Sequence, residues 1–90
     1  MNKLQRGHAA QVLLDSDIFK EVLAETEQHY IQAWRQARTV EAREDCHRYL
    51  TLTAKITDHL KSIATTGALE RRALDELEGR KGNIFAWPKI

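Results

Sequence analysis

The residues best suited to bind a metal ion are the four histidines, His8, His29, His47 and His59. Glu44 and His47 form one Glu-x-x-His step, whereas di-iron sites in helical bundles use two such steps and two further inward glutamates. Glu25 and His29 are four residues apart, a spacing typical of a solvated pair on a helix surface. The sequence therefore predicts no metal site and no cofactor.

The single cysteine, Cys46, is the only candidate thiol nucleophile. It lies between Ala42 and Tyr49 in a repeat of small and apolar residues, which predicts a buried side chain rather than a reactive one. The sequence also has no His-Glu-x-x-His, no phosphate-binding glycine loop and no Gly-x-Ser-x-Gly motif. We therefore predict a protein that is not an enzyme and has no catalytic residues.

Basic residues form two local clusters that could hold the phosphates of a nucleic acid. The contacts expected in that case are Arg35, Arg38, Arg71, Arg72, Arg80 and Lys81. Acidic residues are interspersed among both clusters, as on solvated helix faces, and the formal net charge is only +1. Nucleic-acid binding is therefore an alternative and not the favoured function.

The composition predicts one folded, intracellular domain. The chain has 90 residues, of which 42% are hydrophobic and 30% charged, values that are ordinary for a globular or coiled-coil protein. Its start lacks the apolar stretch of a signal peptide, and no window approaches the roughly 20 apolar residues that cross a bilayer. We expect no association with a membrane.

The elements that must position these groups are predicted to be helices. Residues 8 to 66 contain no glycine or proline. Within them, Asp15-Ser16-Asp17 and Arg38-Thr39-Val40 supply short polar side chains that can cap a new helix. We expect helices over residues 3 to 14, 17 to 37 and 40 to 65, then a left-handed stop at Gly67 and a fourth helix over 68 to 78. The fold class is thus all-α, a long antiparallel helical hairpin with short flanking helices.

Both long helices repeat small or apolar residues at alternating spacings of four and three, the pattern of a coiled-coil seam. The first seam comprises Phe19, Leu23, Thr26, Tyr30, Ala33 and Ala37, and the second Ala42, Cys46, Tyr49, Thr53, Ile56, Leu60 and Ile63. Further apolar residues beside the seams, including Ile18, Val22 and Leu52, exceed what two helices can cover. Either the flanking helices or another copy of the chain must cover them.

Residues 83 to 90 form an apolar C-terminal tail after a helical domain over residues 1 to 82. The large apolar residues of the tail are Ile84, Phe85, Trp87 and Ile90. Their burial would contribute about 1.5 to 3 kcal/mol each, and ordering the backbone would cost about 1 to 2 kcal/mol per residue. These terms nearly cancel, so two interpretations stay open: the tail packs on its own hairpin, or it docks on another chain.

One ordered set of turn and apolar positions spans most of the chain. It consists of Arg6-Gly7-His8-Ala9-Ala10, Leu13-Leu14-Asp15-Ser16-Asp17, Phe19, Glu27, Tyr30-Ile31, Trp34, Arg43-Glu44, Leu60, Ile63, Gly67 and Leu69. This order resembles small α-helical proteins encoded in tailed-phage and prophage genomes, among head and packaging genes. The match covers about residues 6 to 77. The resemblance implies a role in the virion or in its assembly, and so a location in the host cytoplasm or the virion. It does not identify any catalytic residue in this chain.

Together these features predict a non-enzymatic, phage-type structural or assembly protein that acts through protein–protein contacts of its hairpin and tail. The expected partner-binding residues are Tyr30, Ile31, Trp34, Ile84, Phe85, Trp87 and Ile90. The partner is expected to be another copy, giving a homo-oligomer, or another phage protein. The alternatives are a DNA-binding packaging component resembling a small terminase subunit and a small inhibitor of a host protein.

Overall fold

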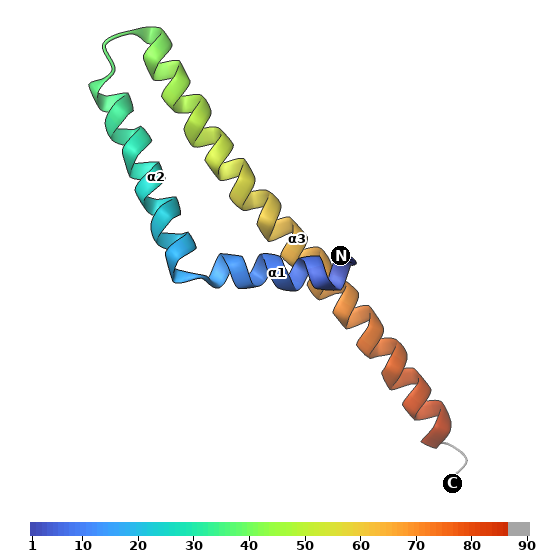
Figure 1. Ribbon diagram of the computed structural model, residues 1–90. Helices are drawn as coiled ribbons and strands as arrows, with labels where there is room; N and C mark the ends of the chain where they lie inside the picture. Colours follow the sequence, from blue (N-terminus) through green and yellow to red (C-terminus); the bar gives the residue numbers. More distant parts are fainter. Residues whose placement is uncertain (87–90) are drawn as a thin grey trace.

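The computed structural model describes the backbone of residues 1–86 and the side chains of residues 1–79. This part of the chain is helical throughout except at short connections, with α1 at Lys3–Asp15, α2 at Asp17–Gln36 and α3 at Val40–Ala86. Helices α2 and α3 run in opposite directions from the connection at residues 37–39 (Figure 1). The C-terminal end of α1 adjoins the start of α2, and α1 crosses α3 in its own N-terminal half, at Gly7. The predicted all-α fold with a long antiparallel hairpin is confirmed.

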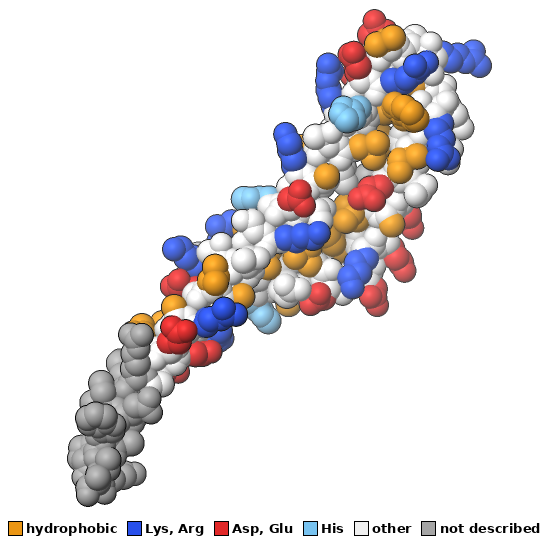
Figure 2. All heavy atoms as spheres, turned by 180° about the vertical axis from the view of Figure 1, so that it is seen from behind, with side chains coloured by type: hydrophobic (Ala, Val, Ile, Leu, Met, Phe, Trp, Pro, Cys, Tyr) orange, Lys and Arg blue, Asp and Glu red, His pale blue; other side chains and the backbone are white. Residues whose placement is uncertain are grey.

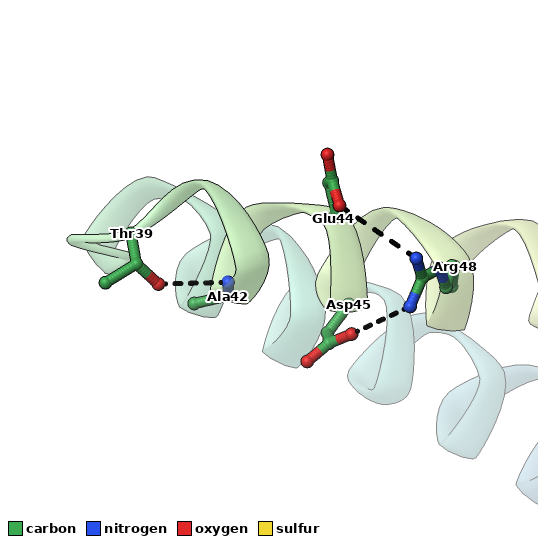
Figure 3. Close-up of polar contacts among 5 residues, drawn as sticks. All are labelled: Thr39, Ala42, Glu44, Asp45 and Arg48. Carbon is green, nitrogen blue, oxygen red and sulfur yellow. Dashed lines mark hydrogen bonds and ion pairs between the residues drawn. The ribbon is translucent and has the colours of Figure 1, made fainter.

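A polar side chain caps the start of each helix, at the predicted positions for α2 and α3 and at Asn2, which was not predicted, for α1. The Asn2 side chain accepts a hydrogen bond from the backbone N–H of Gln5 at 2.8 Å, and the Gln5 side chain accepts one from the backbone N–H of Asn2 at 3.0 Å. The hydroxyl of Ser16 accepts from the N–H of Phe19, and that of Thr39 from the N–H of Ala42 at 3.1 Å (Figure 3). These acceptors satisfy N–H groups that the first helical turn leaves free.

Gly67 does not end a helix, so the predicted stop is wrong. Helix α3 continues through Gly67, and the segment 68 to 78 predicted as a fourth helix is the continuation of α3. No glycine in the described part of the chain has a positive φ angle. The sequence signal was misleading because glycine serves equally well where a left-handed residue ends a helix and where two helices touch.

The two buried glycines lie where α1 crosses α3. A Cβ atom added to Gly7 would be 2.5 Å from the Cα of Gly67, and one added to Gly67 would be 2.6 Å from the Cα of Gly7. The carbonyl oxygens of Ile63 and Lys3 are also within 3.2 Å and 3.1 Å of these two positions, respectively. The two backbones therefore approach closely at this point, which only glycine permits.

The contact between α2 and α3 differs in detail from the predicted seams. Five of the seven predicted seam residues of α3 are partly or fully buried, namely Ala42, Cys46, Thr53, Leu60 and Ile63. The other residues of α3 that are at least partly buried are Leu50, Thr57, Ala64 and Gly67. Tyr49 and Ile56, which the sequence placed in the seam, are about half exposed. The buried stripe is thus rotated towards the neighbouring positions Leu50 and Thr57, because a repeat of four and three does not itself show which flank the partner helix covers. On α2 the six predicted seam residues are all partly buried.

The described part of the molecule is a long rod with almost no core. Its dimensions are 78 × 23 × 21 Å and its radius of gyration is 21.4 Å, whereas a compact domain of this length has about 12 Å. Among the described side chains, Ala10 and Cys46 are the only hydrophobic ones that are buried, at 5% and 8% exposure. The described part of the chain thus leaves many of its large apolar side chains in contact with solvent.

Candidate protein-binding surfaces

The predicted binding residues of the hairpin are not equivalent. Tyr30 is partly buried, with its ring centroid 5.0 Å from that of Tyr49 at a tilt of 33°, so it joins α2 to α3. Trp34 is 49% exposed. Ile31 is partly buried and lies three residues before Trp34, on the same side of α2. Trp34 is therefore the residue of this group that offers the largest free apolar surface to a partner.

Other large apolar side chains are exposed along all three helices. They are Val12, Leu13, Ile18, Val22, Val40, Tyr49, Leu52, Ile56, Leu69, Leu74 and Leu77, in addition to Met1 and Trp34. Figure 2 shows hydrophobic side chains distributed along the length of one face, between charged groups of both signs. The sequence left open whether the flanking helices or another chain cover Ile18, Val22 and Leu52. All three are exposed, so the described flanking helices do not cover them.

The predicted tail lies largely outside the described residues. The backbone of α3 extends to Ala86, which includes positions 83 to 86 of the tail. The side chains of Ile84 and Phe85, and the whole of Trp87 and Ile90, fall outside the described part. Their assignment as partner-binding residues therefore stays a prediction.

The predicted phosphate contacts do not form one patch. Arg35 and Arg38 flank the connection between α2 and α3, whereas Arg71 and Arg72 lie on α3 beyond its crossing with α1. Residues 38 and 71 are 33 positions apart, and most of the intervening chain is helix, which rises about 1.5 Å per residue and so separates the two groups by roughly 45 Å. The side chains of Arg80 and Lys81 fall outside the described residues.

A further arginine near the hairpin connection, Arg48 of α3, forms ion pairs. Arg48 contacts the carboxylate of Asp45 at 3.2 Å and that of Glu44 at 3.9 Å (Figure 3). All three side chains are more than half exposed, so these pairs contribute little stability. They do, however, lower the positive charge available to a phosphate at this end of the molecule.

The crossing of α1 and α3 forms a basic hollow that sequence reasoning missed. Lys3 and Arg6 of α1 line it together with His59, Ser62, Ile63 and Thr66 of α3. More than fifty positions separate the two groups in sequence, and no local motif connects them. Only the close approach at Gly7 and Gly67 brings these side chains together.

The described His, Cys, Asp and Glu side chains do not form a metal-type cluster, since no group of three or more of them within residues 1–79 gathers where it could hold a metal ion. Cys46 is a free, buried cysteine. Of the helices described, none has a stretch both long enough and apolar enough to cross a membrane.

Comparisons with known proteins give no family assignment. No protein-family model matches the sequence, and neither the curated proteins nor the solved structures contain a match.

Proposed function

We propose that this chain is a non-enzymatic structural or assembly protein of the phage type, which acts by docking the exposed apolar edges of its helices on other protein chains. The observation behind the proposal is the almost complete lack of a core: Ala10 and Cys46 are the only buried hydrophobic residues among the described side chains. The phage context is supported by the resemblance over residues 6 to 77 alone.

The energetics of such a rod favour a bound state. Burial of apolar surface is the main favourable term in folding, at about 25 cal/mol per Å². A leucine, isoleucine or tryptophan side chain that is half exposed supplies only part of the burial free energy that it could supply. More than ten large apolar side chains are exposed to about this extent. Contact with another protein would bury them, so association should stabilise the helices as well as join the partners.

Trp34 is the position at which we expect a partner to be detected in cells. When Trp34 is replaced by the photo-crosslinking residue benzoylphenylalanine, illumination of cells that naturally express the chain should give a discrete cross-linked product. The partner in that product can be identified by mass spectrometry. The bulky aromatic replacement keeps the exposed apolar surface of this side chain, which is expected to contact the partner.

The control position is Gln32, which is exposed on α2 two residues away and so points to a different side of the helix. A product specific to position 34 that contains a second copy or a phage protein supports the proposal. A specific product with a host enzyme would favour the inhibitor alternative instead. Equal products from positions 34 and 32 would contradict binding through Trp34.

The second candidate function, a DNA-binding packaging component, is favoured by the hollow lined by Lys3, Arg6 and His59. Several basic groups that contact phosphates release counterions, so binding to duplex DNA should weaken about 10-fold or more between 50 and 200 mM salt if two or more phosphates are neutralised. Replacing Lys3 and Arg6 with alanine should then reduce both the affinity and its salt dependence, as measured by fluorescence anisotropy. Affinity that hardly changes with salt would exclude this mode of binding.

A further inference from the structure

Beyond its crossing with α1, helix α3 projects away from the rest of the described chain (Figure 1). In this part only Ala68 and Arg71, next to the crossing, line a hollow together with α1. Every residue from Ala68 to Gly79, here named the projecting segment, is exposed. It nevertheless contains three leucines, Leu69, Leu74 and Leu77, with exposures of 57%, 39% and 52%. Isolated helices of this length are marginal in water, and exposed leucines do not stabilise them. The segment therefore has both the composition and the free surface of a helix that pairs with another helix.

The apolar stripe of the projecting segment continues a stripe that α1 covers. Leu60, Ile63, Gly67, Glu70, Leu74 and Leu77 follow one another at intervals of three and four. Up to Gly67 this side of α3 is packed against α1, where the two glycines touch. From Glu70 onward nothing in the described chain covers it. The stripe has the spacing of a coiled-coil seam. A second helix could pack on it after Gly67, as α1 packs on it before Gly67.

The charges of the projecting segment are separated along its axis. Its first half contains Arg71 and Arg72 with one acidic residue, Glu70, and so has a net positive charge, whereas its second half contains Asp75, Glu76 and Glu78 and no basic residue. Two parallel segments in register would place each charged cluster beside its own copy, so like charges would repel. Two antiparallel segments would instead place the basic half of each beside the acidic half of the other. The charge pattern thus favours a second copy in the opposite direction.

We infer that the projecting segment is a dimerisation helix that pairs antiparallel with the same segment of a second copy of this chain. The inference rests on the proposed function, because it names the partner of one exposed surface. With the two-fold axis between residues 75 and 76, Leu74 of each copy packs against Leu77 of the other. On the flank of the same contact, Arg71 of each copy lies beside Glu78 of the other.

Helix α1 limits the length of this contact. Because α1 occupies the stripe at Gly67, a second helix can lie on α3 only from about Glu70 onward. The overlap is short, and the area falls below the roughly 800 Å² per partner of a stable interface. The dimer should therefore dissociate on dilution, which makes its formation measurable by concentration.

Light scattering of the full chain tests the inference. Between about 10 µM and 1 mM, the solution mass should rise from 10.4 kDa toward twice that value, as expected for a weak two-fold contact. The double variant Leu74→Ala/Leu77→Ala should stay at the monomer mass over the same range. Alanine favours helix at these exposed positions, so far-UV circular dichroism should show unchanged helicity.

Charge exchange tests the direction of the pairing. Arg71→Glu or Glu78→Arg alone should reduce dimer formation several-fold, because each places like charges together across the contact. The double variant Arg71→Glu/Glu78→Arg, and an equimolar mixture of the two single variants, should both recover the dimer. A parallel pair in register already places positions 71 and 78 beside like charges, so the single variants would not weaken it and the double variant would restore nothing. Loss of the dimer in both single variants, followed by recovery in the double variant, therefore requires that position 71 of one chain meets position 78 of the other.

Three results would overturn the inference. If the wild-type chain stays monomeric up to about 1 mM, a second copy does not bind the projecting segment with a dissociation constant in the millimolar range or below. A dimer that survives Leu74→Ala/Leu77→Ala uses another surface. If the leucine variant loses the dimer but neither single charge variant weakens it, then positions 71 and 78 do not meet and the proposed antiparallel register is wrong. None of these results affects the cross-linking test at Trp34, so the proposed function can stand when this inference fails.

Discussion

Replacing Gly67 with alanine is expected to disrupt the packing of α1 on α3 and to lower the free energy of unfolding by about 1 to 3 kcal/mol. The added Cβ would lie 2.6 Å from the Cα of Gly7 and 3.1 Å from the carbonyl oxygen of Lys3. Both neighbours are backbone atoms, so the clash can be relieved only if the helices move apart. Urea unfolding followed by far-UV circular dichroism at one fixed protein concentration measures the effect.

The matched control is Gly79→Ala in the same helix. A Cβ at Gly79 would have no neighbour within 4 Å, so this substitution should act through helix propensity alone and stabilise the helix by up to about 1 kcal/mol. Gly7→Ala should resemble Gly67→Ala, and the double variant should cost less than the two single changes added, because both disrupt one contact. If Gly67→Ala and Gly79→Ala change stability alike, the two helices do not touch at this crossing.

Introducing a charge at Cys46 is also expected to lower the free energy of unfolding substantially. Cys46 is 8% exposed in the stripe of α3 that is most buried. The carboxylate introduced by Cys46→Asp would lose water there, and we expect a loss of about 3 kcal/mol in the free energy of unfolding. The measurement is the same urea titration, with helicity at zero denaturant as a check that the variant still folds.

His47→Asp is the control for this change. His47 is the next residue and is exposed, so the same carboxylate at that position stays solvated and should alter stability by less than about 0.5 kcal/mol. A Cys46→Asp variant as stable as His47→Asp would show that position 46 is open to water and that the helices of the hairpin are apart in solution.

Local signals were sufficient to predict where the second and third helices begin. Ser16 and Thr39 have short side chains that accept the first free N–H groups of a helix, and both do so in the structure. Capping depends on residues within one turn of each other, so a single sequence contains all the information needed. The hairpin followed, because a connection of three residues between long helices leaves them no arrangement but an antiparallel one.

The candidate binding surface was predicted only in part. Trp34 is exposed as expected, but Tyr30 contributes to the contact between the helices, and the exposed edge at Tyr49 and Ile56 had been assigned to the seam. A repeat of four and three has two flanks of similar hydrophobicity. Which flank is covered depends on how the helices rotate about their axes, and that is decided by long-range packing.

The sequence by itself determined an all-α chain with helix starts at its polar caps, because these depend on neighbours within a few residues. Only the tertiary structure decided what Gly67 does. A glycine at this position could end a helix by adopting a left-handed conformation, or it could let two helices touch. In the structure, Gly67 does the second, because α1 lies against it. The crossing with Gly7 then set where α1 stops covering α3, and so which leucines beyond it are left exposed. That choice depends on a contact between residues 60 positions apart, which local propensity does not encode.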